Sequence, residues 1–362
     1  MNLLSEYGWE TFINIQKKSV SDIRHDNSYI SGTGRVITQY GKYYSVALQR
    51  GIKKAVLAGS LHYAGTQAAV GDWVSCDSGD TCVIKEILPR YGIVSRKVPG
   101  EETTEQILAA NVDVIFVVIG MDDNYRVSRV ERYLTAAYES GASPVILLNK
   151  SDLLTPEEIA VRQVEIEEIA FGIPVCPVSA AENFGFEEIY TNLGEGQTAV
   201  FLGSSGVGKS SIVNCLLQSQ VQKTNETREA DGKGKHTTTR RELFLLPEGG
   251  IVIDTPGLRE LQLWSAGDTE PMKGAFADIE AAAERCKFRD CSHINEPGCA
   301  VRDAIASGEI GEKHFQNYLK MRKELAWLGR RQDERAAREE ALKFAKMYRE
   351  GMENVKRKRG GL

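Results

Sequence analysis

The sequence predicts a multidomain protein with an N-terminal β-barrel, a central α/β domain and a C-terminal helical module. Short β-rich runs separated by turns come first, apolar strands alternating with amphipathic helices follow, and a polar helical region with clustered cysteines comes last. The 362 residues are too many for one ordinary core and suit two or three packed units. We expect a lead-in of open role over residues 1–31, the barrel over 32–92, the α/β domain over 93–262 and the helical module over 263–362.

The barrel is predicted from β-rich runs that turn signals such as Val70-Gly71-Asp72 separate. Their spacing indicates a small antiparallel barrel of the oligonucleotide-binding (OB) type. Scattered basic residues would suit a face that binds nucleic acid, although a packing module with solvated charges fits the same pattern. The runs cover residues 35–40, 43–48, 72–76 and 81–87, and the basic residues are Lys53, Lys54, Lys85 and Arg90.

The central domain is predicted from apolar segments that alternate with helical ones, which is typical of a largely parallel sheet covered by helices. After this domain, a long charged helix is expected from about Glu312. Buried strands are expected over residues 112–120, 144–148, 173–178, 198–202 and 250–253, and helices over 127–140, 156–170, 186–192 and 209–218.

Composition is that of a globular protein, with 42% hydrophobic and 26% charged residues. The longest strongly apolar stretch, Val112 to Gly120, contains Asp113 and is too short to span a bilayer. The seven cysteines are either scattered among apolar neighbours or crowded near His293, which argues against a disulfide framework. We therefore expect a cytoplasmic monomer that does not engage a membrane.

Charge is unevenly distributed along the chain. The formal net charge is −5, yet residues 330–362 carry eleven Lys or Arg against six Asp or Glu. Such a tail can engage phosphate backbones or can be a solvated helix, and charge alone leaves both interpretations open.

The strongest local signal is a glycine-rich loop between an apolar strand and a helix, the context required of a phosphate-binding loop. Its glycines let backbone N–H groups turn toward phosphate oxygens, and the helix N-terminus favours an anion. Lys209 would reach the β- and γ-phosphates and is a predicted catalytic residue, while Ser210 would ligate Mg²⁺. The predicted nucleotide-binding residues of this loop are Gly203, Ser204, Ser205, Gly206, Val207, Gly208, Lys209, Ser210 and Ser211.

Guanine specificity is predicted from Asn149-Lys150-Ser151-Asp152, which follows an apolar strand. The Asp152 carboxylate can accept hydrogen bonds from the N1–H and exocyclic amine of guanine, a donor pair that adenine lacks on that edge. Lys150 can lie along the base, and Asn149 can brace the site. Ser179-Ala180, after the next strand, would present a backbone N–H to the guanine O6.

A third element, Asp254-Thr255-Pro256-Gly257, again follows an apolar strand directly. Asp254 would hold the Mg²⁺ shell through water, and the Gly257 N–H would sense the γ-phosphate. One threonine of residues 232–239, by preference Thr238, would complete Mg²⁺ coordination and take part in catalysis. A flexible surface loop is the alternative interpretation of that stretch.

The order of these motifs is rotated, because ordinary GTPases begin with the phosphate loop and end with the guanine motifs. Here residues 149–152 and 179–180 precede residues 203–210 and 254–257. The central domain is therefore predicted to be an α/β P-loop GTPase with circularly permuted topology. One pocket tolerates this rotation since domain termini commonly lie close together.

Hydrolysis without a partner is predicted to be slow. Leu258 stands where many GTPases place the glutamine that orients the attacking water. His236 is the best remaining polar candidate for that role, and a merely solvated loop histidine is the alternative.

A metal centre is predicted from three thiols and one imidazole within fourteen residues of the helical module. They supply a closed tetrahedral shell for Zn²⁺, and a full protein shell is typical of a structural site. Because the spacing lacks paired Cys-x-x-Cys motifs, unligated reduced thiols are the alternative. The predicted ligands are Cys286, Cys291, His293 and Cys299.

Together, the rotated motifs, the preceding barrel and the Cys3His cluster resemble the circularly permuted ribosome small-subunit-dependent GTPase family. The resemblance covers about residues 32–327 and includes residues 130–134, 137–141 and 236–239. It implies GTP/GDP, Mg²⁺ and one structural Zn²⁺ as ligands. It also implies a late-assembly factor that binds the 30S ribosomal subunit and leaves after GTP hydrolysis stimulated by the particle, with His236 as catalytic histidine. The barrel and zinc module would contact rRNA.

Two other functions remain compatible with the motifs. An ATP-dependent enzyme or kinase could use the same phosphate loop, and nucleotide competition would reveal it. A nucleotide-gated scaffold could bind a protein or membrane partner without ribosome-linked turnover.

Overall fold

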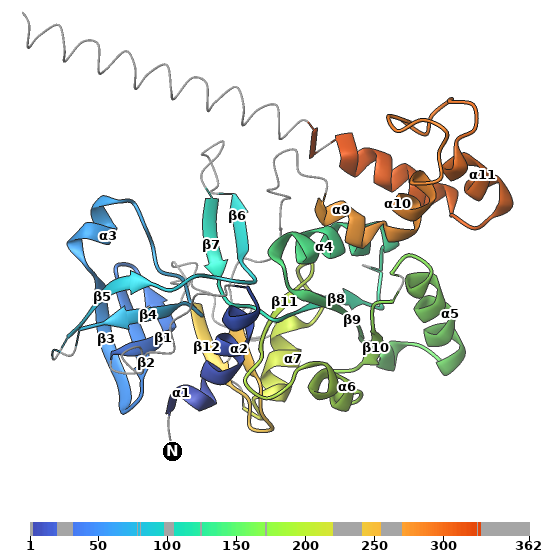
Figure 1. The fold of residues 1–362 in the computed structure, drawn as a ribbon. Helices are drawn as coiled ribbons and strands as arrows, with labels where there is room; N and C mark the ends of the chain where they lie inside the picture. The colour runs from blue at the N-terminus through green and yellow to red at the C-terminus, as the bar shows by residue number, and fades with distance from the viewer. Residues whose placement is uncertain are drawn as a thin grey trace, which may run out of the picture.

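The computed structural model shows the barrel and the central domain side by side, with the C-terminal helices beyond them (Figure 1). Among the described residues, no helix is both long and apolar enough to cross a membrane. The described residues are 3–19, 32–77, 79, 81–97, 105–123, 125–170, 172–219, 241–254, 270–323 and 325–326.

Five strands close into the predicted barrel. β1 pairs with both β2 and β4, which closes the order β1-β2-β3-β5-β4 on itself. Side chains that alternate along the strands meet inside, among them Val36, Val46 and Ile84. The elements are β1 (Thr33–Tyr40), β2 (Tyr43–Leu48), β3 (Gly51–Leu57), α3 (Gly59–Tyr63), β4 (Trp73–Cys76) and β5 (Cys82–Ile87).

The prediction of a wholly antiparallel barrel is wrong in one pairing. β3 and β5 run parallel, with Ala55 opposite Cys82. A parallel pair cannot be joined by a tight turn, and here α3 and β4 lie between the two strands in sequence. β3 was not among the predicted strands, because Lys53 and Lys54 interrupt its apolar pattern.

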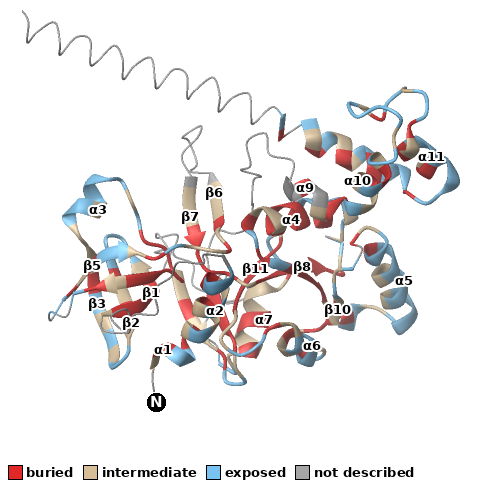
Figure 2. Cartoon of the chain, in the orientation of Figure 1, coloured by how far each residue is buried: buried red, intermediate tan, exposed pale blue. Residues whose placement is uncertain are grey.

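The central sheet has the predicted parallel strands, in the order β10-β9-β8-β11-β13. β8 shows why they are strongly apolar: Ile115, Val117 and Ile119 belong to one core, while Val114 and Phe116 belong to the core on the opposite face. Figure 2 shows β8 buried and α5 largely exposed. The strands are β8 (Val114–Gly120), β9 (Ser143–Asn149), β10 (Val175–Val178), β11 (Thr198–Leu202) and β13 (Ile251–Asp254), and the helices are α4 (Val127–Ser140), α5 (Pro156–Glu167), α6 (Phe186–Asn192) and α7 (Lys209–Leu216).

One strand joins the barrel and the central sheet. β12 (Arg241–Leu245) pairs antiparallel with β13 on one side and with β1 on the other, where Thr38 lies opposite Glu242. Within the part of the chain that the structure describes, the result is a single eleven-stranded sheet. Neither β12 nor the hairpin of β6 (Val94–Lys97) and β7 (Glu105–Ala109) was predicted. The predicted domain boundaries stay predictions.

The N-terminal lead-in packs at this junction, through α1 (Leu3–Glu6) and α2 (Trp9–Ser19). The rings of Trp9 and Phe12 lie 4.8 and 5.5 Å from the ring of Trp73 on β4. These contacts give the segment a packing role that its sequence did not reveal.

Arg35 is the buried centre of the junction, with an exposed fraction of 1%. Its guanidinium donates to the Tyr7 carbonyl of the lead-in at 2.5 Å, to the Gly71 carbonyl of the barrel at 3.2 Å and to Thr198 Oγ1 of β11 at 2.7 Å. It also lies over the Trp73 ring at 5.3 Å. One side chain thus connects three parts of the chain.

The C-terminal helices pack on α4. Phe276 and Tyr318 share a core with Val130 and Leu134 of α4. The helix predicted from about Glu312 is present over residues 312–323, and its course beyond residue 326 lies outside the described part of the chain. The other helices of this module are α9 (Glu270–Ala275), α10 (Ala277–Ala283) and α11 (Ala300–Ser307).

Candidate nucleotide site and metal centre

The predicted nucleotide motifs meet at one edge of the central sheet. Because β9, β10, β11 and β13 belong to one parallel set, their carboxyl ends share that edge. Asn149 ends β9, Ser179 follows β10, Gly203 follows β11 and Asp254 ends β13. The rotated order along the chain therefore brings the motifs together at the sheet edge where α/β proteins bind ligands.

The phosphate loop has a backbone that depends on glycine. Gly203, Gly206 and Gly208 have φ values of +151°, +80° and +97°. Lys209 begins α7, and its Nζ donates to the carbonyls of Gly203 and Ser204 at 2.7 Å each. The ammonium group therefore lies over the loop in which the phosphates are predicted to bind.

Asn149 joins the guanine motif to the phosphate loop. This side chain is 1% exposed, donates from Nδ2 to the Val207 carbonyl at 2.7 Å and accepts at Oδ1 from the Ala180 N–H at 3.1 Å. A Cβ on Gly208 would lie 2.2 Å from Asn149 Nδ2, so the amide leaves room only for glycine there. Three motifs that are far apart in sequence are thereby held as one unit.

Two serine hydroxyls orient the guanine-specificity loop. Ser179 Oγ donates to Asp152 Oδ1 at 2.5 Å, and Ser151 Oγ donates to the Val178 carbonyl at 2.9 Å. Asp152 is exposed in the short helix η2 (Ser151–Leu153), whereas Ser179 is 1% exposed. The exposed carboxylate is thus held in place by a buried hydroxyl.

Asp122 is a residue of this site that the motif analysis missed. Lys150 has a φ of +68°, and its Nζ lies 2.6 Å from Asp122 Oδ2. Asp122 follows β8, so it reaches the same sheet edge as the motif residues. An acidic residue directly after a buried strand was the signal that could have identified it.

The remaining predicted residues are only partly described. Ser210 and Ser211 lie half-buried in the first turn of α7, and Asp254 lies half-buried opposite Glu242. Their roles toward a nucleotide and Mg²⁺ stay predictions. The others fall outside the described residues, namely His236, Thr238, Gly257 and Leu258.

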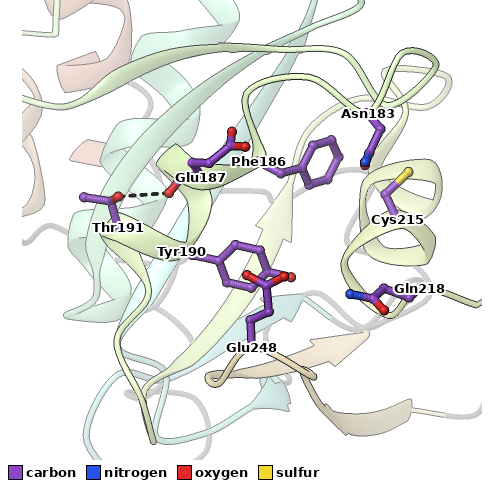
Figure 3. Close-up of a pocket in the computed structure, with 8 residues that line it drawn as sticks. All are labelled: Asn183, Phe186, Glu187, Tyr190, Thr191, Cys215, Gln218 and Glu248. Atoms are coloured by element: carbon purple, nitrogen blue, oxygen red, sulfur yellow. Dashed lines mark hydrogen bonds between the residues drawn. The ribbon is translucent and has the colours of Figure 1, made fainter.

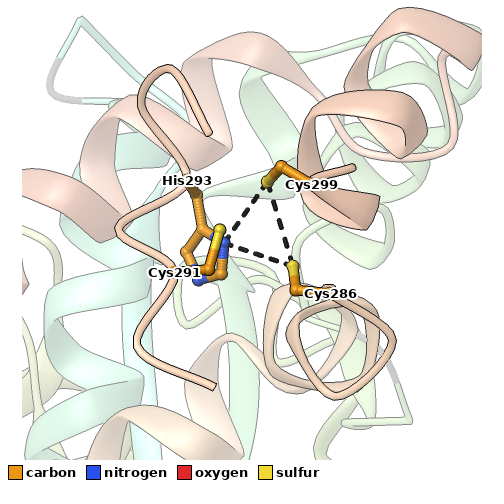
Figure 4. A group of neighbouring side chains, drawn as sticks. All are labelled: Cys286, Cys291, His293 and Cys299. Atoms are coloured by element: carbon orange, nitrogen blue, oxygen red, sulfur yellow. Dashed lines mark hydrogen bonds between the residues drawn. The ribbon is translucent and has the colours of Figure 1, made fainter. Parts of the chain in front are cut away.

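The predicted metal ligands gather in one place (Figure 4). Their ligand atoms all lie within 4.8 Å of one another. Cys286 Sγ lies 3.9 Å from Cys299 Sγ, and His293 Nδ1 lies 3.6 and 3.5 Å from these two sulfurs. Zn–S bonds of about 2.3 Å in a tetrahedron place neighbouring sulfurs about 3.8 Å apart. The four side chains Cys286, Cys291, His293 and Cys299 therefore fit a tetrahedral Zn²⁺ shell.

A buried histidine links the metal-binding module to the central domain. His314 Nδ1 lies 2.6 Å from Glu131 Oε1 of α4, and Nε2 lies 3.1 Å from Asp278 Oδ1 of α10. Asn317 donates to the other oxygen of Glu131 at 2.6 Å. Burial alone would lower the pKa of His314, but the hydrogen bonds and charges of Asp278 and Glu131 outweigh it and raise the pKa to about 9. The imidazole is therefore positively charged at neutral pH.

Comparison with known proteins identifies one family of GTPases. Residues 87–264 match the family model described as RsgA GTPase. A small ribosomal subunit biogenesis GTPase RsgA of Leptospira interrogans is 39% identical over 99% of this chain and 98% of its own length. The corresponding RsgA 1 of Oceanobacillus iheyensis is 41% identical over 92% of this chain and 96% of its own.

Solved structures show the same architecture. YjeQ from Thermotoga maritima has a TM-score of 0.63 and 29% identity over 81% of this chain and 98% of its own. YloQ, described as a circularly permuted GTPase, has a TM-score of 0.61 over 81% of this chain and 94% of its own, and its 23% identity supports the fold alone. On this combined evidence, the chain belongs to the RsgA GTPase family and has the fold of a circularly permuted GTPase.

Proposed function

We propose that this protein binds the small (30S) ribosomal subunit and assists its late maturation, hydrolysing GTP to GDP and phosphate with turnover that the particle stimulates. It would act as a monomer in the cytoplasm. The observation that carries the nucleotide part is Asn149, which bonds at once to the phosphate loop and to the Ser179-Ala180 loop. The names of relatives that match nearly the whole chain support the ribosomal part.

The nucleotide would lie along the carboxyl edge of the sheet. Asp152, held by Ser179, would accept the guanine donors, and Lys150, held by Asp122, would lie along the base. Lys209 would move from the loop carbonyls to the β- and γ-phosphates as these arrive. Ser210, Thr238 and a water held by Asp254 would complete an Mg²⁺ shell.

Hydrolysis would depend on a residue other than glutamine. His236 would place the attacking water, with Leu258 as the hydrophobic residue after the Asp254–Gly257 motif. This assignment is supported by sequence position alone and predicts slow turnover without the ribosomal particle.

Zinc would be structural. The donor set has three thiolates and one imidazole, which fill a tetrahedral shell and leave no open position for a substrate. Zn²⁺ would hold the segment that links the short helices α10 and α11.

Contact with rRNA is supported by the exposed end of the β1–β2 hairpin. Tyr40 and Tyr43 are 58% and 53% exposed, and Lys42 Nζ lies 5.6 Å from the centre of the Tyr43 ring. Exposed aromatic rings beside a cation are suited to unstacked bases and a phosphate backbone.

The test measures GTP turnover with and without purified 30S subunits, for the wild type and for His236→Ala. We expect strong stimulation by 30S subunits in the wild type and its loss in the variant, with GDP affinity preserved. An unstimulated wild type would remove the ribosomal assignment. Equal stimulation of both proteins would move only the catalytic role away from His236.

A further inference from the structure

A cavity of about 580 Å³ is lined by α6, the residue Asn183 before it, the end of α7 and Glu248. Figure 3 shows Glu187, Tyr190 and Thr191 of α6 on one side, and Cys215 of α7 with Gln218 just beyond that helix on the other. The lining residues are Asn183, Phe186, Glu187, Tyr190, Thr191, Cys215, Gln218 and Glu248. None of them is assigned a part in nucleotide or zinc binding.

The lining combines aromatic rings with carboxylates. Phe186 and Tyr190 present rings, and Glu187 and Glu248 are exposed at the rim. Tyr190 and Glu248 line the same cavity, and burial and, after it, the charge of Glu248 raise the pKa of Tyr190. Among the described residues, no Lys or Arg lines the cavity and no ion pair involves Glu187 or Glu248.

Elsewhere in the same chain, a tyrosine ring beside a carboxylate contacts an arginine side chain. At Tyr125, the guanidinium of Arg162 lies 4.7 Å from the ring centre, and the Tyr125 hydroxyl donates to Glu165 Oε2 at 2.9 Å. In the cavity, the Tyr190 hydroxyl donates instead to the Leu216 carbonyl at 3.4 Å, so Glu248 keeps both oxygens for a ligand, and the cation is not among the lining residues. The cavity therefore has the environment of an arginine site.

The acidic sequence that includes α6 indicates what kind of partner could bind. Residues 163–208 contain seven glutamates, Glu165, Glu167, Glu168, Glu182, Glu187, Glu188 and Glu195, and no Lys or Arg. Of these, Glu187 lines the cavity and Glu188 follows it on α6, and together with Glu248 they disfavour a phosphate backbone and favour a basic polypeptide. The cavity differs in this respect from the basic, aromatic end of the β1–β2 hairpin.

We propose that this cavity binds an arginine side chain presented by a basic segment of a protein partner. The planar guanidinium stacks on Tyr190 and pairs with the carboxylates of Glu248 and Glu187. A lysine ammonium fits less well, since it cannot stack and donate in a planar fork at once. The small-subunit assignment is not needed for this binding.

The cavity is coupled to the nucleotide site through its wall. Cys215 Sγ donates to the Ala180 carbonyl at 3.4 Å, and the Ala180 N–H is the one bonded by Asn149. α7, which carries Cys215, begins at Lys209. A segment bound in the cavity therefore changes the rate of GDP release.

The test mixes the full chain, with GDP and Mg²⁺ present, with a fluorescent, acetylated tetra-arginine peptide. Peptide binding is measured by fluorescence anisotropy at about 0.15 M salt. We expect Glu187→Gln/Glu248→Gln to weaken binding about tenfold or more. The matched variant Glu168→Gln/Glu188→Gln removes the same charge from exposed positions outside the cavity and should weaken it less than about twofold. Tyr190→Leu, which keeps every charge, should weaken binding about threefold or more.

Three results would overturn the proposal: no binding by the wild type, equal weakening in the two glutamine variants, or undiminished binding by Tyr190→Leu. Retained GDP affinity in each variant shows that it is folded. In the wild type, saturating peptide should change the release rate of a fluorescent GDP analogue, and an unchanged rate would reject the coupling. Because no ribosomal subunit is present, the outcome is separate from that of the 30S experiment.

Discussion

The barrel and the C-terminal module are attached to the same central domain by two different buried cations. Arg35 donates mainly to backbone carbonyls at a junction where β1 also continues the sheet. His314 instead bridges two carboxylates between helices that no sheet connects. A guanidinium stays charged throughout the accessible pH range, whereas an imidazole titrates. The charge at the first attachment therefore does not change with pH, whereas the charge at the second requires a bound proton.

The largest expected effect is at the barrel junction. Arg35→Met should lower the free energy of unfolding by about 3–5 kcal/mol, because several buried acceptors lose their donor together. Urea unfolding measures this, and the barrel and central domain should lose stability together. Lys54→Met removes the same charge from an exposed site and should have little effect. A loss below about 1 kcal/mol for Arg35→Met would contradict its central role.

A smaller and more local effect is expected at the other junction. His314→Ala leaves Glu131 and Asp278 without their shared cation and should cost about 2–3 kcal/mol. Hydrogen exchange should quicken in α10 and residues 312–323 but not in β1. His62→Ala, at an exposed position in α3, is the matched control. Faster exchange throughout the chain would show that the two attachments are not independent.

The pH dependence separates the two cations directly. The pKa of His314 is about 9 in the folded protein, above its ordinary value of 6.5. Its contribution to stability is therefore fully present below pH 6.5 and declines as the pH rises through about 9. The difference in unfolding free energy between wild type and His314→Gln should shrink over that window. A constant difference would mean that the bridge is not charged.

The smallest effect is expected at Asp122, away from both junctions. Its pair with Lys150 is partly solvated, with exposed fractions of 21% and 30%, so screening weakens it. Asp122→Asn should raise the Kd for GDP about three- to fivefold in a titration with a fluorescent analogue. Asp123→Asn, at the exposed neighbouring position, should leave the Kd unchanged.

Local patterns were enough to locate many elements. The helices expected over residues 127–140 and 186–192 have those bounds in the structure. α5 begins at Pro156, as expected, where Thr155 and Glu158 form a reciprocal capping box. Its expected end was three residues late, because no glycine or proline marks where the last turn stops.

Strands with weak local signals were missed. β12 begins with Arg241 and Glu242, so its sequence lacks the continuous apolar pattern that would have predicted a strand between β1 and β13. Asp122 and His314 were missed for a related reason, since each acts through a partner distant in sequence.

By itself, the sequence determined the phosphate loop, the guanine motif, their rotated order and the cysteine cluster, because each is a short pattern whose chemistry depends on neighbouring residues. Only the tertiary structure decided which distant residues meet. Arg35 lies 163 positions from Thr198, and His314 lies 183 positions from Glu131. Such contacts are set by how strands and helices pack, which leaves no periodic trace in the chain.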